Sequence, residues 1–428
     1  MARVVAKIKN RSKIIMILMM RHGLKFLFYL LPLTFRDAIR TCAYCIKARK
    51  YNTASQRADD IVENSVLIVD HFVPRANQDA GSVATINQLK IFKQLGYQVC
   101  FMPMLQQQGD ESYLSELKNM GVEILLAASP MVYLQHHAEK FKMVFIYRYP
   151  IARLLKKTLM TNMATKFIIN PADLFYLRQQ RFAKLMRSAL LDYVAKRIKT
   201  EELAILQKAD AVVVHSHVEK KLLDIELKQT PVTTLPIFVE LMPTPAAFNE
   251  REGILFLGNY QHQPNVDAVT FFVNEIYPLI KQRIPNLHFY IVGSHPTAAV
   301  KALVSDGITV TGQVEDLYEL MNQVKIAVAP LRFGAGMKGK LCTTMAYGLP
   351  TIASSMATEG MNVNNEKDIL VADTVATWVE SIKKLLTDSQ LWTVIRANAY
   401  TYIEQYHTLS YGVDITQELV TLIQPSSK

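Results

Sequence analysis

The sequence is poor in cysteine, and its cysteines are not placed as a disulfide framework requires. Cys42, Cys45, Cys100 and Cys342 are scattered through 428 residues, which indicates a reducing compartment. Cys42 and Cys45 form a Cys-x-x-Cys pair, but no second pair or nearby histidines accompany it. We therefore interpret the pair as a chance spacing and not as a zinc or redox site. The chain also contains no Asp-x-Asp pair, and the sequence implies no metal.

The main body of the chain lacks the basic excess that a nucleic-acid groove requires. Residues 1–50 hold twelve Lys and Arg and a single acid, Asp37. Removing them from the 48 basic and 37 acidic residues of the whole chain leaves 36 of each. The net charge of +11 therefore belongs to a basic N-terminal tail, and nucleic acid is not an expected partner.

The tail lacks an uninterrupted apolar run. Between residues 14 and 35, twelve Ile, Leu and Phe favour bilayer insertion by about 5 kcal/mol in total. Arg21 and Lys25 each oppose it by about 3 kcal/mol, so spanning is not favoured. An interfacial helix pair fits better, with these bases against anionic headgroups: Arg3, Lys7, Lys9, Arg11, Lys13, Arg21 and Lys25. The alternative is a helical flap packed on the first domain; the internal charges argue against a signal peptide.

The rest of the chain alternates between buried-strand and helix patterns. The run 65–70 is continuously apolar, a helical stretch follows at 82–95, and a strand restarts at 98–102. This spacing is typical of a βαβ unit and a parallel sheet. A Pro-rich stretch at 235–245 interrupts the rhythm, and a second alternation follows it.

We therefore predict an α/β protein with two doubly wound, Rossmann-like domains that face a cleft. The predicted division is an N-terminal basic helical appendage at 1–60, a first domain at 61–245 and a second domain at 246–428. Ligands of open α/β sheets bind at the carboxyl ends of the strands, so the cleft is the expected site.

The segment from Ala329 to Lys340 carries the clearest chemistry. It joins a buried strand to a helix, and its glycines, Gly334, Gly336 and Gly339, let the backbone approach a ligand. The helix N-terminus adds about half a positive charge. Three cations add to it: Arg332, Lys338 and Lys340. This combination is suited to a diphosphate.

The glycines and lysines of this loop also match the spacing of two other nucleotide-binding motifs. The three glycines spell GxGxxG, but that dinucleotide fingerprint belongs at the first βα turn, and this loop lies at about the fourth. Residues 334–340 also read GxxxxGK, but Leu341 stands where an NTPase needs Ser or Thr for magnesium. A structural role for turn glycines and solvated lysines is the remaining alternative.

From Ile254 to Met361 the sequence closely resembles the C-terminal half of group 1 glycosyltransferases with the GT-B fold. These are retaining enzymes of bacterial surface-polysaccharide and glycoconjugate synthesis. The resemblance rests on residues 256–260, the His262-x-Pro-Asn-x-Asp267 motif, residues 291–294, residues 310–314, the basic loop and residues 357–360. A weaker likeness extends over about 65–422, with matches at 69–74, 79–82, 173–178 and 209–213. The basic tail lies outside it.

The resemblance implies a nucleotide-diphosphate sugar in the cleft as a donor substrate, with no cofactor. The implied donor-binding residues are Gly81, Ser82, Gly258, Asn259, His262, Gly312, Val314, Arg332, Gly334, Gly336, Lys338, Lys340, Thr343 and Glu359. The nucleotide base would lie near Gly312 and Val314. The candidate catalytic residues are Asp79, Lys338 and Glu359, although Asp79 is equally suited to cap a turn.

The sequence departs from the family pattern at the start of the helix after the lysines. Family members usually have a glutamate there for the donor's ribose hydroxyls, and this chain has Thr343. A threonine cannot bind two hydroxyls as a carboxylate does. Glu359 is one substitute, and a local capping role for it is the alternative. A second glutamate, expected near Ala335, is also missing, and Phe175 stands where close relatives often have His.

The resulting hypothesis is a metal-independent glycosyltransferase, with retention implied by the resemblance alone. Its expected partners are a nucleotide sugar, a glycan, lipid-linked or protein acceptor, and an anionic membrane surface that contacts residues 1–50. The expected location is cytoplasmic, peripheral on the inner face of the cell membrane. A catalytically degenerate GT-B subunit that binds a partner enzyme or acceptor is the alternative. A nucleotide-sugar epimerase is disfavoured, because no distinctive acid/base pair is present.

Overall fold

The computed structural model describes residues 28–29, 31–52, 64–161, 165–243, 246–314 and 316–423. The basic residues of the predicted membrane-facing tail, from Arg3 to Lys25, lie outside these ranges. Within the described part, no helix combines the length and the apolar character that crossing a bilayer requires.

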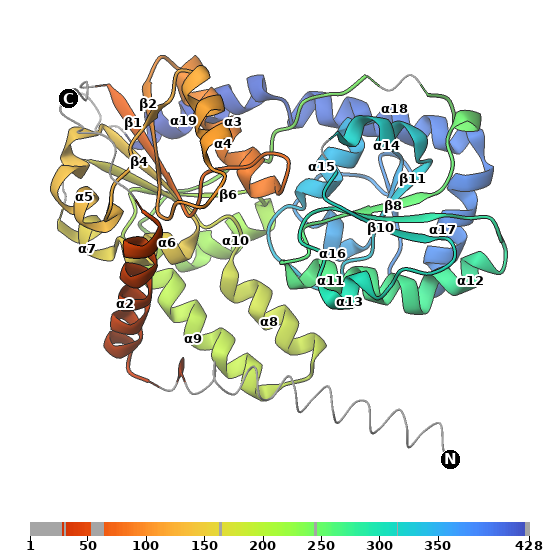
Figure 1. The fold of residues 1–428 in the computed structure, drawn as a ribbon, viewed down its shortest axis with the longest axis horizontal. Helices are drawn as coiled ribbons and strands as arrows, with labels where there is room; N and C mark the ends of the chain where they lie inside the picture. Colours follow the sequence, from red (N-terminus) through yellow and green to blue (C-terminus); the bar gives the residue numbers. More distant parts are fainter. Residues whose placement is uncertain are drawn as a thin grey trace.

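Two parallel sheets organise the described chain, as predicted (Figure 1). The first has seven strands in the order β3-β2-β1-β4-β5-β6-β7, and the second has six in the order β10-β9-β8-β11-β12-β13. The strands of the first sheet are β1 Ser65–Asp70, β2 Gln98–Pro103, β3 Glu123–Ile124, β4 Met143–Tyr147, β5 Lys166–Asn170, β6 Ala211–Val214 and β7 Val232–Thr234. Those of the second are β8 Ile254–Leu257, β9 Phe289–Val292, β10 Ile308–Gly312, β11 Ile326–Ala329, β12 Thr351–Ala353 and β13 Leu370–Val371.

Helices cover both sheets. Those before the second sheet are α2 Leu33–Tyr51, α3 Ala80–Gln94, α4 Glu111–Asn119, α5 Pro130–His137, α6 Tyr149–Leu154, α7 Lys156–Thr161, α8 Phe175–Leu185, α9 Ala189–Leu206 and α10 His217–Glu226. Those that follow are α11 Gln263–Phe271, α12 Tyr277–Lys281, α13 Ala298–Lys301, α14 Leu317–Gln323, α15 Gly339–Ala346, α16 Ser355–Thr358, α17 Val375–Thr387, α18 Ser389–Tyr406 and α19 Leu409–Ile423. We call the seven-stranded sheet with the helices that pack on it the first unit, and the six-stranded sheet with the helices that pack on it the second unit.

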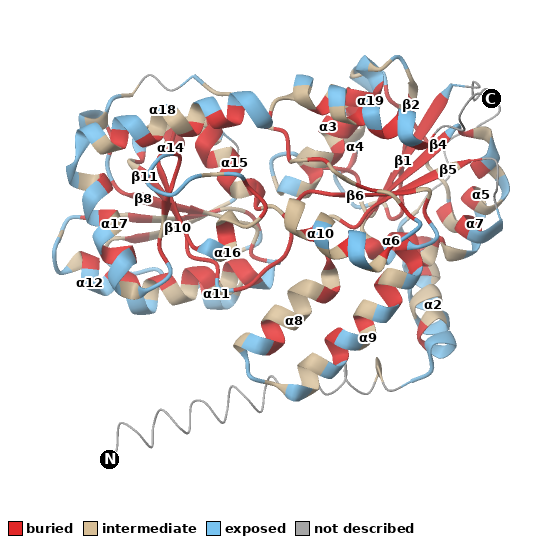
Figure 2. Cartoon of the chain, turned by 180° about the vertical axis from the view of Figure 1, so that it is seen from behind, coloured by how far each residue is buried: buried red, intermediate tan, exposed pale blue. Residues whose placement is uncertain are grey.

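The strands are buried because helices pack on both faces of each sheet (Figure 2). Every residue of β1 and of β4 is buried, which explains why both segments read as continuous apolar runs. In the middle of each sheet the order of the strands reverses direction, between β1 and β4 in the first sheet and between β8 and β11 in the second. These reversals place a crevice at the carboxyl ends of the central strands.

The last helix departs from the predicted domain division. Residues 246–428 were expected to form the second domain, but α19 packs on the first unit. Leu419, Val420 and Ile423 are buried in a core that includes Val66 of β1. Gly412 of α19 allows this approach, since a Cβ atom there would lie 2.7 Å from Ile91 of α3. The last described helix therefore returns to the first unit.

The first described helix, α2, is joined to the first unit by buried charges. Arg36 is 1% exposed and forms an ion pair with Glu201 of α9, which is 4% exposed. Arg153 of α6 forms ion pairs with the same Glu201 and with Asp37 of α2. Tyr44 of α2 donates a hydrogen bond of 2.9 Å to the carbonyl of Met104. Residues 33–51 are thus integrated into the fold, as the helical-flap alternative expected.

Candidate functional site

The candidate site lies where the carboxyl ends of the two sheets meet. Ser294, which follows β9, donates a hydrogen bond of 2.8 Å to the carbonyl of Gln78 in the first unit. A Cβ atom at Gly336, in the loop after β11, would lie 3.1 Å from the Cβ of Asp173, which follows β5. At Gly339 a Cβ atom would lie 2.6 Å from that of Ala80. Glycines in the basic loop therefore let the two units approach closely.

The loop from Leu331 to Lys338 connects β11 to α15 at the reversal of the second sheet. Gly336 has φ +67°, a left-handed conformation that glycine adopts without strain. Lys338 folds back into the loop, where its ammonium donates hydrogen bonds to the carbonyls of Ala335 (3.2 Å) and Gly336. The sequence predicted this loop as a phosphate site. The hydrogen bonds of Lys338 stabilise the backbone conformation of the loop.

The pKa values of Lys338 and Lys340 are both lowered. Burial lowers the pKa of Lys338 to about 8, and the nearby carboxylates of Glu219 and Glu359 oppose this shift. Burial, followed by the charge of Lys338, lowers the pKa of Lys340 to about 7. The Lys340 ammonium donates to Asn265 Oδ1 and lies 4.3 Å from the centre of the Phe256 ring. A dianionic ligand beside these ammonium groups would favour their charged forms.

A second loop, after β8, lies beside the lysines. Gly258 packs against Gly293 so closely that a Cβ atom at Gly293 would lie 2.0 Å from the Gly258 carbonyl oxygen. Asn265 of α11 donates a hydrogen bond of 2.7 Å to the carbonyl of Asn259, while its Oδ1 atom accepts from Lys340. The structure thus joins the predicted residues Gly258, Asn259 and Lys340 through a shared asparagine.

The remaining predicted residues of the second unit are more dispersed. Arg332 is exposed and forms an ion pair with Asp267 of α11. Gly312 ends β10, the edge strand of the sheet, and Val314 packs against a small core that includes Leu255 and Val292. Thr343 donates its hydroxyl hydrogen to the carbonyl of Gly339 at 3.0 Å, which satisfies it within α15.

On the first unit, Asp79 caps α3. Its carboxylate accepts hydrogen bonds from the Ser82 backbone N–H at 2.9 Å and from the Ser82 hydroxyl at 3.0 Å. This is the turn-capping contact that the sequence allowed, and it occupies the Ser82 N–H that the resemblance assigned to phosphate. A direct role of Asp79 toward a sugar remains a prediction.

Arg148 is a cleft residue that sequence reasoning missed. It follows β4 with φ +71°, which is uncommon for a residue other than glycine. Its Nε atom donates to the buried Asp70 carboxylate at 2.7 Å, and Asp70 raises the pKa of the guanidinium. Its terminal nitrogen lies over the backbone of Gly81, at 3.0 Å from a Cβ atom placed there. The positions of Asp70 and Arg148 after the two central strands were the available signal.

Helix α8 carries the main polar contacts across the junction. Arg178 lies 2.7 Å from Asp173 and 2.8 Å from His262 Nε2. Surrounding protein atoms, and then Arg178 and the two loop lysines, lower the pKa of His262, so its neutral ring accepts this hydrogen bond. Arg181 forms two hydrogen bonds with Glu359, of 2.7 and 2.6 Å, and no motif had pointed to it.

His215, next to the junction, has a structural contact. It follows β6 and is buried, with Nδ1 lying 2.7 Å from the Leu235 carbonyl. Ser216 caps α10 by accepting a hydrogen bond from the Val218 N–H. Within the residues that the structure describes, no group of three His, Cys, Asp or Glu is arranged to hold a metal ion.

Comparison with known proteins finds a family to which part of this chain is similar. Residues 251–388 match the family described as glycosyl transferases group 1. A 44.6 kDa protein in the cps region of Klebsiella pneumoniae is 20% identical over 162 residues, 36% of this chain. That match spans 42% of the Klebsiella protein, less than half of its length.

Solved structures resemble nearly the whole chain. Sucrose-phosphate synthase from Thermosynechococcus elongatus has a TM-score of 0.63 at 14% identity, covering 84% of this chain and 98% of that one. TarM has a TM-score of 0.68 at 10% identity, covering 86% and 100%. Anabaena HepE, solved with UDP and glucose, has a TM-score of 0.60 at 11% identity, covering 84% and 100%. At these identities the likeness establishes the shared two-sheet fold.

Proposed function

We propose that this chain transfers a sugar from a UDP-sugar, because residues 251–388 match the group 1 glycosyltransferases and the two sheets have the GT-B arrangement. UDP is the nucleotide in the solved complexes of Anabaena HepE and of the pneumococcal O-GlcNAc transferase GtfA. The observation that carries the proposal is the basic loop at the reversal of the second sheet, with the buried Lys338 and the partly buried Lys340 beside it.

The chain's own groups fit the proposed reaction. Breaking the bond between the sugar and the diphosphate leaves an additional negative charge on the departing UDP. Lys338, Lys340 and the N-terminus of α15 provide positive charge at the loop, and Lys338 is buried. Removing one preorganised donor of this kind typically lowers the rate about 100-fold. Retention at the anomeric carbon is part of the proposal on the family likeness alone.

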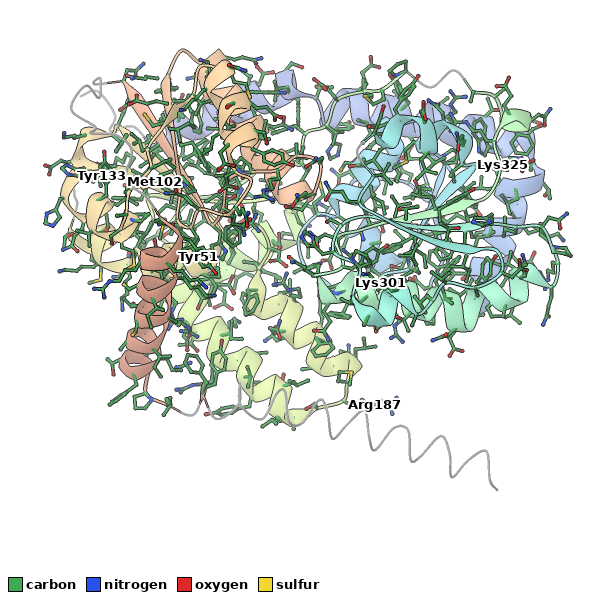
Figure 3. The ribbon with its side chains drawn as sticks, viewed as in Figure 1. Tyr51, Met102, Tyr133, Arg187, Lys301 and Lys325 are labelled. Atoms are coloured by element: carbon green, nitrogen blue, oxygen red, sulfur yellow. The ribbon has the colours of Figure 1, made fainter. Side chains whose placement is uncertain are left out.

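Donor hydrolysis tests the proposal directly. We would measure binding and slow hydrolysis for a panel of UDP- and GDP-sugars, with Lys338→Ala and Lys340→Ala as variants. Lys301→Ala is the matched control, because Lys301 is an exposed lysine of the same unit (Figure 3). We expect hydrolysis of one UDP-sugar to fall about 100-fold in the first two variants and to persist in the control. Equal activity in all three variants would exclude the loop lysines from catalysis.

The second candidate is a catalytically degenerate subunit, and Thr343 is the observation that favours it. The family glutamate at this position is absent, and the threonine hydroxyl is already bonded to Gly339. A Thr343→Glu variant separates the two candidates. Donor binding without turnover in the wild type, combined with turnover in Thr343→Glu, would identify a degenerate site. Turnover by the wild type would exclude this candidate.

The acceptor is proposed to lie at an anionic membrane surface on the cytoplasmic side, reached through residues 1–50. Helix α2 supports this with an apolar stripe that is exposed in the part of the chain that the structure describes: Phe35, Ile39 and Ile46 are 64%, 46% and 64% exposed. Their spacing of four and seven residues places them on one face of the helix, opposite its buried residues Tyr44 and Ala48. Exposed bases follow the stripe at Lys47, Arg49 and Lys50. Such a face favours anionic headgroups.

Vesicle sedimentation tests the membrane proposal. The full chain should bind vesicles of phosphatidylglycerol and phosphatidylcholine but not of phosphatidylcholine alone. Replacing Phe35, Ile39 and Ile46 by serine should lower binding at least tenfold without unfolding the protein, because these side chains are already exposed. Serine at Leu279 and Val304, exposed apolar residues of the second unit, is the matched control. Unchanged binding after the α2 substitutions would contradict docking through α2.

A further inference from the structure

We propose that Arg181 is a positioning residue that fixes the donor-binding loop and Glu359 from the opposite unit, and thereby sets the turnover number of the enzyme. The inference deepens the proposed function and rests on it. It starts from helix α8, which belongs to the first unit but contacts the loop after β11 in the second.

The contacts of Arg181 are directional. Its two terminal nitrogens donate hydrogen bonds to the two carboxylate oxygens of Glu359, at 2.7 and 2.6 Å. The Nη1 atom also donates to the carbonyl of Gly334 at 2.8 Å. Arg181 and Glu359 side chains are 18% and 19% exposed, so solvent screens the pair only partly. A planar guanidinium that binds a carboxylate through two parallel hydrogen bonds restricts its rotation. A lysine could keep the charge but not this geometry.

The bond to Gly334 determines how the loop presents its backbone. In a trans peptide the carbonyl and the following N–H point in opposite directions. Because α8 holds the Gly334 carbonyl, the N–H of Ala335 is turned away from α8. Lys338 holds the next two carbonyls, those of Ala335 and Gly336, from inside the loop. The orientation of three consecutive carbonyls is therefore set by two cations, one from each unit.

Helix α8 itself is fixed at its start. Glu202 of α9 accepts hydrogen bonds from the backbone N–H groups of Phe175 (3.0 Å) and Tyr176 (2.8 Å). Glu219 of α10 accepts from the N–H of Leu174 at 2.9 Å. Both carboxyl groups are fully enclosed, at 0% exposure. They satisfy donors that a helix N-terminus leaves unpaired, so α8 is held rigidly where it reaches the second unit.

A second contact of α8 supports the same loop. The ring of Phe182 lies 5.0 Å from that of Phe333, and both residues are buried. Arg181 and Phe182 thus hold the adjacent loop residues Gly334 and Phe333. Small displacements of a reacting group reduce rates strongly, so loss of this support should act on turnover more than on ground-state donor binding.

Kinetics of Arg181→Gln and Arg181→Lys test the proposal, with Lys184→Gln as the matched control. Lys184 is an exposed base on the same helix. We expect Arg181→Gln to lower kcat about 100-fold and Arg181→Lys about tenfold, with KM for the UDP-sugar changing less than threefold. Lys184→Gln should behave as the wild type. Unchanged kcat in Arg181→Gln, in a protein with unchanged thermal stability, would overturn the proposal.

A double-mutant cycle separates positioning from a general structural effect. If Arg181 acts through Glu359, Arg181→Gln should lower kcat less than threefold in a Glu359→Gln background. Equal effects in both backgrounds would refute action through Glu359.

Hydrogen exchange of residues 330–338 in the ligand-free protein keeps the proposal testable without turnover. Exchange should rise at least tenfold in Arg181→Gln but not in Lys184→Gln. Wild type that neither binds nor hydrolyses any UDP-sugar would refute the proposed function, whereas unchanged exchange in Arg181→Gln would refute the positioning role.

Discussion

Replacing Glu201 should uncouple α2 from the first unit. Its carboxylate lies among three guanidinium groups: Arg36 and Arg153, which are almost fully buried, and Arg40 at 3.2 Å. Glu201→Gln retains the shape but removes the negative charge. Breaking a buried pair by removing one partner typically costs about 3 to 5 kcal/mol of folding free energy. Asp37 still faces Arg153 at 2.8 Å, so part of the charge remains balanced and we expect about 3 kcal/mol.

The two units offer separate signals for this measurement. Both tryptophans, Trp378 and Trp392, lie in the core of the second unit. Urea unfolding followed by tryptophan fluorescence therefore reports the second unit, and circular dichroism at 222 nm reports both. Glu201→Gln should shift the dichroism transition to lower urea while the fluorescence transition moves less. Trypsin should also cleave faster at Lys47 and Arg49 in α2.

Glu226→Gln is the matched control for Glu201. Glu226 also pairs with a base, Lys199 at 2.6 Å, but both side chains are 34% exposed. A pair at the surface contributes about 0 to 1 kcal/mol. If Glu201→Gln and Glu226→Gln had equally small effects, the charge cluster would not hold α2 in place. Deletion of residues 1–60 would then leave the fold intact, as expected for a detachable appendage.

Three further changes have defined outcomes. Glu202→Ala leaves the buried N–H groups of Phe175 and Tyr176 without their acceptor and should destabilise the protein by about 3 kcal/mol, measured by urea unfolding. Donor affinity should decrease as pH rises through about 7, because the pKa of Lys340 is lowered to about 7 and its ammonium loses its proton there. Calorimetry from pH 6 to 9 measures this affinity. In a Lys340→Met variant the donor affinity should no longer depend on pH in this range. Gly293→Ala places a methyl group 2.0 Å from the Gly258 carbonyl and should lower the melting temperature strongly, whereas alanine at Gly109, which also has a positive φ but has no atom within 4 Å of the added methyl group, should lower it less.

The sequence was sufficient for the sheets because their signal is local. The strand predicted at 65–70 is confirmed at both ends, since burial on both faces requires an unbroken apolar run. At the edge of the sheet, where pairing is possible on one side, β3 is only Glu123–Ile124. β7, at Val232–Thr234, was missed because three residues after a proline carry no clear periodicity. The fold class could be predicted, while the lengths of edge strands could not.

The candidate site also has one part that could be predicted from the sequence and one part that could not. The basic loop could be read from its own glycines and lysines, because a phosphate-binding backbone needs them within a few residues of each other. Arg181 has no such pattern: Gly334 and Glu359 lie 153 and 178 residues further along the chain. Arginine on a helix surface is ordinary, and only the folded arrangement distinguishes Arg181 from the exposed Lys184 three residues later. Contacts between two units are set by how α8 is anchored, and that anchoring depends on carboxylates from α9 and α10. A site built at such a junction is therefore predictable from sequence on the side that binds the ligand, and not on the side that holds it in place.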